Sequence, residues 1–181
     1  MIFCTPSGNF GNLTGGLLAN KMGLPVKKFI AATNINDVVP EYLDTGIFSP
    51  RPSLQTYSNA MDVGNPSNFD RMLALYKTKE NMKKDIVGYK VTDNEVLSTI
   101  KKVYEKYNYL LDPHGAVGYK ASESFIEEYN EMESPIIFLE TAHPAKFGEV
   151  IETNLGIKID IPDILKEYMQ KEKNAIFIKN S

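Results

Sequence analysis

The turn Ser7-Gly8-Asn9-Phe10-Gly11-Asn12 contains the residues best suited to chemistry. This turn follows a short apolar segment at 2–4, which predicts a strand, and precedes a helical pattern at about 13–22. In open α/β sheets, ligands bind where a strand's carboxyl end meets a helix's amino end. Backbone N–H groups of the first helical turn and the helix dipole both favour an anion there. The turn is therefore a candidate phosphate site; a tight turn with an asparagine cap is an equally weighted alternative.

The composition of the turn narrows the class of phosphate site. Gly8 and Gly11 allow a closer backbone approach than a residue with a Cβ, and Ser7, Asn9 and Asn12 add side-chain donors. The sequence lacks the Gly-x-x-x-x-Gly-Lys-Ser/Thr pattern of nucleoside-triphosphate loops and the Gly-x-Gly-x-x-Gly pattern of dinucleotide sites. Neither of those two functions is supported.

A second polar group, Glu140-Thr141-Ala142-His143-Pro144, follows the apolar run at 136–139, which is typical of a buried parallel strand. If that run is a strand of the same parallel sheet, Thr141 emerges at the same edge as the phosphate turn, where its hydroxyl can bond a ring nitrogen or a substrate. His143 and His114 each stand beside Pro or Gly, and we favour structural hydrogen bonding over acid–base catalysis for both. The two histidines lie too far apart in sequence to show metal-ligand spacing, so no metal site is expected.

Other candidate chemistry is weak. Cys4 is the one cysteine, which excludes an internal disulfide and a cysteine-rich zinc site, and no Gly-x-Ser-x-Gly elbow occurs. Nucleophilic hydrolysis therefore has little support. The polar loop from Asn59 to Asn68 either lines a site or caps the helix after it, and for Ser67 we favour capping.

The hydrophobic pattern predicts the elements that position these groups. Strands are expected at 2–4, 28–32 and 136–139, and the first strand, first helix and second strand together have the length of a βαβ unit. The fold class is therefore α/β, with a mostly parallel sheet flanked by helices. Further helices are expected at 37–43, 69–76 and 116–131, and another follows a capping box at Thr92. A short helix is expected to end at about 155 and another to begin after a cap at Asp160. An edge strand is expected at 175–178.

Composition excludes several classes of protein. The 181 residues are 43% hydrophobic and 24% charged, as in globular domains, with a net charge of −3. Such a balance does not suit a general nucleic-acid binder. The apolar run at 136–139 is far shorter than the roughly 20 residues of a membrane helix, and no secretory leader pattern opens the sequence. No nucleic-acid or membrane partner and a cytoplasmic location are expected.

Several longer motifs resemble the threonine synthases, which are pyridoxal-phosphate enzymes of fold type II. They stand in the family's order and span roughly residues 1–156: Pro6 to Gly16, Phe29 to Asn34, Asn36 to Pro40, Ser58 to Phe69, Asp112 to Tyr119, and Leu139 to Phe147. Threonine dehydratases and cysteine synthases are weaker alternatives, because Asn65-Pro66-Ser67-Asn68 and Ala142-His143-Pro144 are not their patterns.

The resemblance implies which part of the enzyme this is. Family members are much longer, and their earlier part carries the lysine that forms the Schiff base, in a context that no lysine here shares; Lys146 belongs to a later motif. The sequence, which opens abruptly on an apolar segment, therefore resembles the carboxyl-terminal portion. Residues 1–156 would form part of the cofactor-binding large domain, and residues 157–181 a helical tail without a recognisable motif.

The resemblance also implies a function. The family converts O-phospho-L-homoserine and water to L-threonine and phosphate, a carbon–oxygen lyase reaction. By analogy, Gly8, Asn9, Phe10, Gly11 and Asn12 would hold the phosphate of pyridoxal 5'-phosphate. Thr141 would share a hydrogen bond with its pyridine nitrogen. With no Schiff-base lysine, no catalytic residue is assigned within this chain, and the isolated chain is expected to be inactive.

Two expectations remain open from the sequence. The alternative function is a stand-alone, non-catalytic module that binds phosphate or another ligand. A part of an α/β domain would also expose strand edges and apolar surface, so self-association of the chain is expected.

Overall fold

The fold is built on one parallel sheet. The computed structural model describes residues 1–172 and 174–176. Within them the sheet has the order β3-β2-β1-β4, and every neighbouring pair is parallel. The expected α/β class with a mostly parallel sheet is confirmed. The strands are β1 (Ile2–Pro6), β2 (Lys28–Thr33), β3 (Ile86–Lys90) and β4 (Ile136–Phe138).

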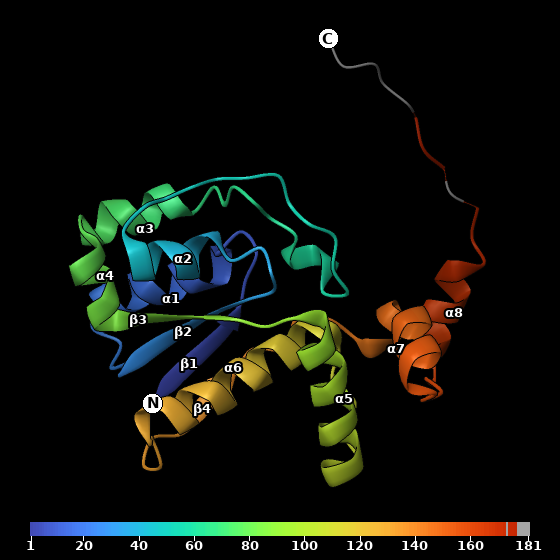
Figure 1. Ribbon diagram of the computed structural model, residues 1–181. Helices are drawn as coiled ribbons and strands as arrows, with labels where there is room; N and C mark the ends of the chain where they lie inside the picture. Colours follow the sequence, from blue (N-terminus) through green and yellow to red (C-terminus); the bar gives the residue numbers. More distant parts are fainter. Residues whose placement is uncertain (173, 177–181) are drawn as a thin grey trace.

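Helices cover both faces of this sheet, as Figure 1 shows. One face carries α1 (Gly11–Lys21), α2 (Val38–Thr45), α3 (Phe69–Tyr76) and α4 (Lys79–Asp85). The other face carries α6 (Pro113–Tyr129), against which α5 (Asp93–Tyr107) packs. Two short helices, α7 (Gly148–Leu155) and α8 (Asp163–Met169), follow the last strand.

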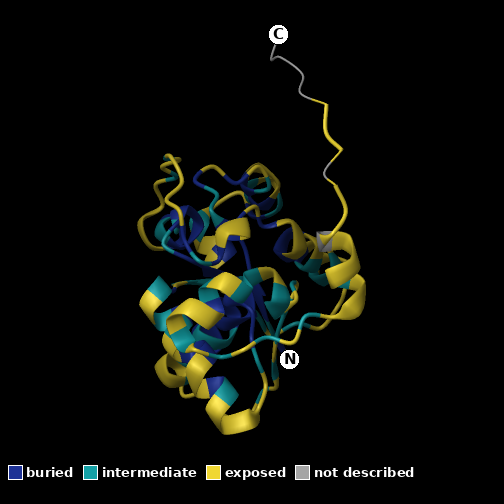
Figure 2. Cartoon of the chain, turned by 90° about the vertical axis from the view of Figure 1, so that its right-hand side faces the viewer, coloured by how far each residue is buried: buried dark blue, intermediate teal, exposed yellow. Residues whose placement is uncertain are grey.

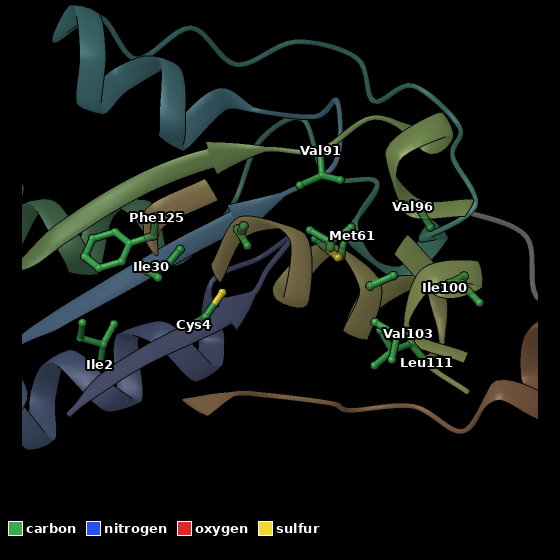
Figure 3. Packing of buried hydrophobic residues seen from close by; sticks show 14 of the residues in the cluster. Ile2, Cys4, Ile30, Met61, Val91, Val96, Ile100, Val103, Leu111 and Phe125 are labelled. Atoms are coloured by element: carbon green, nitrogen blue, oxygen red, sulfur yellow. The ribbon is translucent and has the colours of Figure 1, made fainter. Parts of the chain in front are cut away.

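Alternating side chains of the central strands create two cores. Ile30 and Ala32 of β2 belong to the cluster formed with α5 and α6, whereas Phe29 and Ala31 belong to the cluster formed with α1, α2 and α3. Figure 3 shows the first cluster, in which Cys4 and Ile30 lie near Phe125 of α6. Buried residues fill the interior between the helices, whose outer faces are exposed (Figure 2). Both faces of the central strands are thus covered, which is the usual environment of parallel strands.

Local start signals explain several helix boundaries. Thr92 and Glu95 form the expected capping box at the start of α5, and α3 has the bounds that its pattern predicts. The helix expected at 116–131 begins earlier, because Asp112 caps it and Pro113 occupies its first turn.

The sequence pattern missed α4 and β3. The helix α4 is strongly polar, and Met82 is its one buried residue, so no apolar periodicity marks it. The strand β3 contains Gly88, where a Cβ would lie 2.7 Å from Pro40 Cα of α2. Close packing of α2 on the sheet therefore requires a residue with no side chain in a strand, which weakens the strand signal.

The strand β4 is parallel, as expected, but it is not buried. It pairs with β1, and Ile137 between its two half-buried neighbours is 39% exposed. Ile136 and Phe138 pack against the α6 core, whereas Ile137 points to the opposite face and joins neither cluster of buried residues in the described part of the chain. Self-association of the chain remains a prediction, and the exposed strand β4 at the edge of the sheet is a surface through which two chains could pair.

The tail differs from the sequence prediction. Asp160 does not cap a helix there, because the residue before α8 is Pro162, which has no side-chain oxygen to accept a hydrogen bond. The edge strand expected at 175–178 falls partly outside the described residues, which leave out 177–181. Among the helices of the described residues, none is long and apolar enough to cross a membrane.

One ion pair joins Glu131, which follows α6, to Lys27, which precedes β2, and makes stability depend on pH. Lys27 Nζ and the backbone N–H of Ser134 donate to the Glu131 carboxylate and lower its pKa from 4.5 to about 2. A lowered pKa in the folded state gives stability that is present above pH 4.5 and lost as pH falls toward 2. We expect Glu131→Gln to flatten the pH dependence of the urea midpoint in this range. The exposed neighbour Glu133, changed to Gln, serves as control, and equal slopes for both variants would contradict the assignment.

Candidate functional site

The turn at 7–12 occupies the position that the sequence predicted. It joins the carboxyl end of β1 to the amino end of α1, and the backbone N–H of Ser7 donates to the carbonyl of Ala32 at 2.8 Å. Phe10 precedes the helix in a left-handed conformation, with φ of 60°, and its side chain is buried. No side chain caps α1, so the expected alternative of an asparagine cap is wrong.

The absence of a cap leaves a row of free donors. In the described part of the chain, the backbone N–H groups from Gly8 to Asn12 make no hydrogen bond to protein acceptors. They surround a hollow of about 190 Å³ lined by residues 6–12. Free N–H groups at the start of an 11-residue helix, together with its dipole, are suited to hold an anion.

Gly8 is required by a close backbone contact. A Cβ at Gly8 would lie 2.7 Å from Met61 Cα and 3.0 Å from the Met61 carbonyl carbon and oxygen. Met61 ends the short 3-10 helix Asn59–Met61 and is buried. The turn therefore packs directly against the loop that the sequence analysis left open as a possible site wall.

Asn9 is fastened to the same loop. Its Oδ1 accepts hydrogen bonds from the backbone N–H and the hydroxyl of Ser67, and its carbonyl accepts one from the Asn68 side chain. The expectation that Ser67 caps α3 is wrong, because Asn68 precedes that helix and Ser67 Oγ points to Asn9 instead.

Thr141 lies at the same edge of the sheet as the turn. The strands β1 and β4 are parallel, with Cys4 opposite Phe138, so the segments that follow them leave the sheet on the same side. Thr141 is exposed and lines a hollow of about 380 Å³. The other residues that line it are Asn59, Ala60, His114, Ala142, Lys146 and Phe147.

The 3-10 helix Asn59–Met61 connects the two hollows. Its last residue contacts Gly8 of the turn, and its first two residues line the hollow that contains Thr141. One segment therefore borders both candidate binding regions, which lie at the ends of two different strands.

His114 holds that segment in place. Its Nε2 accepts the backbone N–H of Ala60 at 3.2 Å, so its proton is on Nδ1, which donates to Asp112 Oδ1 at 2.7 Å. Asp112 is fully buried and also accepts the backbone N–H of His114. His143 uses its Nδ1 to accept the backbone N–H of Ala145. The favoured structural role of both histidines agrees with these bonds.

Glu140 contacts the segment that begins α6, next to His114. Its carboxylate accepts the hydroxyl of Tyr109 at 2.9 Å and the backbone N–H of Asp112 at 3.1 Å. Burial raises the pKa of Glu140, and the neighbouring Asp112 carboxylate raises it further. Gly115 permits this approach, because a Cβ there would lie 2.8 Å from Glu140 Oε1.

A buried polar network fixes the loop that carries the 3-10 helix. Asn34 and Asn36, which follow β2, both donate to Asp62 Oδ1, and Asp62 Oδ2 accepts the backbone N–H of Thr56. Thr56 also donates its hydroxyl to Asp62 Oδ1 at 2.8 Å. The sequence analysis did not identify this network, since its members are 28 residues apart and carry no spacing signal.

The structure shows the surroundings of Cys4 and Lys146, to which the sequence analysis gave no role in the site. Cys4 is fully buried in β1, and burial raises its pKa to about 12, so it stays a thiol at neutral pH. Lys146, which the sequence analysis assigned to a later motif than that of the Schiff-base lysine, lines the hollow beside Thr141.

Comparison with known proteins gives consistent results. A family model described as "Threonine synthase, C-terminal" matches residues 115–181. The chain is 42% identical over 170 residues to threonine synthase from Haemophilus influenzae and 44% identical over 169 residues to that from Escherichia coli. These matches cover 94% and 92% of this chain but 39% and 38% of the relatives, so the chain spans about two fifths of their length.

Solved structures agree in fold. The E. coli threonine synthase structure matches with a TM-score of 0.83 and 42% identity over 93% of this chain and 39% of that chain. A structure described as PLP-bound threonine synthase from Brucella melitensis matches with a TM-score of 0.85 and 32% identity over 96% of this chain and 42% of that chain. A tomato threonine deaminase, 17% identical with a TM-score of 0.62, shares the fold. In sequence and in fold, the chain matches the carboxyl-terminal part of the threonine synthases.

Proposed function

We propose that this chain supplies part of the pyridoxal 5'-phosphate site of a threonine synthase, with residues 1–156 as part of the large domain and 157–181 as a helical tail. The observation that carries the proposal is the row of free backbone N–H groups around the hollow at 6–12. These donors meet the requirements of a phosphate monoester, which offers several acceptor oxygens and a negative charge. Because Gly8 has no Cβ, the turn can pack directly against the main chain of Met61.

In this proposal, Gly8, Asn9, Phe10, Gly11 and Asn12 bind the cofactor phosphate, mainly through the main chain. Because backbone donors are fixed by the turn and by α1, they need no side-chain ordering when the anion binds. This arrangement accounts for the lack of a basic residue in the turn itself.

Thr141 is proposed to hydrogen-bond the pyridine nitrogen at the other end of the cofactor ring. Its position at the same sheet edge as the turn supports this role. A neutral hydroxyl, unlike a carboxylate, does not enforce protonation of that nitrogen, so it moderates the electron demand of the ring. When bound, pyridoxal phosphate supplies the electron-withdrawing ring that stabilises negative charge on a substrate carbon.

The proposed reaction of the complete site is the conversion of O-phospho-L-homoserine and water to L-threonine and phosphate, in the cytoplasm. Proton transfers in this reaction need a basic side chain next to the reacting carbons. The sequence offers no lysine in the family's Schiff-base context, so we propose that the 181-residue chain does not turn over by itself. Release of phosphate from O-phospho-L-homoserine by the purified chain would contradict this part of the proposal.

The binding part is tested by titrating the ¹⁵N-labelled chain with pyridoxal 5'-phosphate and following backbone amide resonances. We expect the amides of residues 8–12 and of Thr141 to shift together with one saturation curve. Inorganic phosphate should shift residues 8–12 and leave Thr141 unmoved, because it lacks the ring. Pyridoxal without phosphate serves as the matched control and should bind much more weakly. Saturable shifts confined to other residues would rule out the proposed site.

A further inference from the structure

Asn9 is held at three points by a segment from another part of the chain. Its Oδ1 accepts the Ser67 backbone N–H at 2.6 Å and the Ser67 hydroxyl at 3.0 Å. Its carbonyl accepts the Asn68 side-chain amide at 2.8 Å. The Asn9 side chain is nevertheless exposed, so these bonds do not result from burial in a core.

The main chain at Asn9 depends on these bonds because the other contacts of the turn lie on either side of it, at Gly8, which packs on Met61, and at the buried Phe10. No side chain caps α1, and Phe10 adopts a left-handed conformation that is uncommon for a residue other than glycine. The free N–H groups of the turn also contribute no hydrogen bonds to the protein. The bonds to Ser67 and Asn68 therefore restrain the main chain of the turn from outside it.

The tie itself is firmly supported. Ser67 and Asn68 directly precede α3, and Arg71 in the first turn of that helix donates to Asn68 Oδ1 at 3.2 Å. Phe69, the next residue, is buried and stacks on Phe48 with ring centroids 3.8 Å apart. The amide of Asn68 is thus oriented from one side by Arg71 while it donates to Asn9 on the other.

We propose that Ser67 and Asn68 are positioning residues for the anion site and act through Asn9; we call them the 67–68 clamp. The inference rests on the proposed phosphate-binding function of the turn. The clamp keeps the backbone N–H groups of residues 8–12 aimed at one point before a phosphate monoester arrives. Preorganised donors bind more tightly because less conformational freedom is lost on binding.

The first test measures phosphate affinity by the amide shifts of residues 8–12, with inorganic phosphate as the probe. We expect Ser67→Ala and Asn68→Ala to weaken binding by about 3- to 10-fold each, the range for loss of one hydrogen bond. Ser67→Thr keeps a hydroxyl and should restore most of the affinity. Ser53→Ala removes an exposed serine of the same long loop and should bind like the parent chain. Unchanged affinity in both clamp variants would overturn the inference.

A double-mutant cycle separates the clamp from direct contact with the anion. Asn9→Ala removes the acceptor of both Ser67 bonds, so adding Ser67→Ala to it should cause no further loss of affinity. If the two effects instead multiply, Ser67 acts independently of Asn9, and the positioning role is wrong. Equal urea midpoints of the single variants and the parent chain would exclude a general loss of stability as the cause.

A ligand-free measurement decides the inference even if the chain fails to bind phosphate. We expect the ¹⁵N order parameters of Asn9 and Phe10 to drop from about 0.85 in the parent chain to about 0.6 in the Asn68→Ala chain. Ser53→Ala should leave them unchanged. If phosphate binding is absent but this drop occurs, the proposed function fails and the clamp stands. If binding is present and the order parameters and affinities do not change, the clamp fails and the proposed function stands.

Discussion

Replacing Asp62 by alanine is expected to destabilise the chain by about 3 kcal/mol or more, because each buried donor left without an acceptor costs about 1–3 kcal/mol. Asp62 accepts four hydrogen bonds, from the side chains of Asn34 and Asn36 and from the backbone N–H and hydroxyl of Thr56. Asn34 is fully buried and Asn36 and Thr56 nearly so, so water does not replace the carboxylate easily. Urea denaturation measures the loss directly.

The matched control for this variant is Asp44→Ala. Asp44 is an exposed aspartate in the last turn of α2, where a negative charge faces the negative end of the helix dipole. Its removal should change stability by no more than about 0.5 kcal/mol. A loss below about 1 kcal/mol for Asp62→Ala, close to that of the control, would show that the network does not hold the loop.

Replacing Gly8 by alanine is expected to weaken phosphate binding by at least about tenfold, a change of about 1.4 kcal/mol. The added Cβ would lie 2.7 Å from Met61 Cα, a backbone atom that cannot move aside as the end of a side chain can. The turn and the 3-10 helix Asn59–Met61 must therefore separate, and the free N–H groups lose their common direction. Amide shifts of residues 9–12 on phosphate titration measure the effect.

Gly15→Ala, in the helix α1 that follows the turn, is the control. A Cβ at Gly15 would meet no atom within 4 Å, and alanine favours a helix over glycine by about 1 kcal/mol. This variant should gain stability and keep its affinity for phosphate. If Gly8→Ala binds phosphate as Gly15→Ala does, the close contact with Met61 does not shape the site.

Local sequence patterns were sufficient to predict features that depend on residues close together in the chain. The first strand, the polar turn and the helix after it follow one another directly, so the sequence placed the candidate anion site at the residues where the free N–H groups lie. The capping box at Thr92 likewise fixed the start of α5. Each of these features depends on interactions within about four residues of the chain.

Features that depend on distant contacts were missed. Ser67 looked like a helix cap because its type and position fit one, yet its hydroxyl bonds Asn9, 58 residues earlier. The network of Asn34 and Asp62, which are 28 residues apart, also arises from the fold and not from spacing. The prediction that β4 is buried was wrong for the same reason, because a run of apolar residues does not show which faces of a strand other elements cover.

The most direct test of the central claim is a crystal structure of the chain soaked with pyridoxal 5'-phosphate. The account predicts phosphate oxygens about 2.7–3.2 Å from backbone nitrogens of residues 8–12, with the ring extending toward Thr141. A phosphate bound elsewhere on the surface, or in this turn with the ring directed away from Thr141, would contradict it.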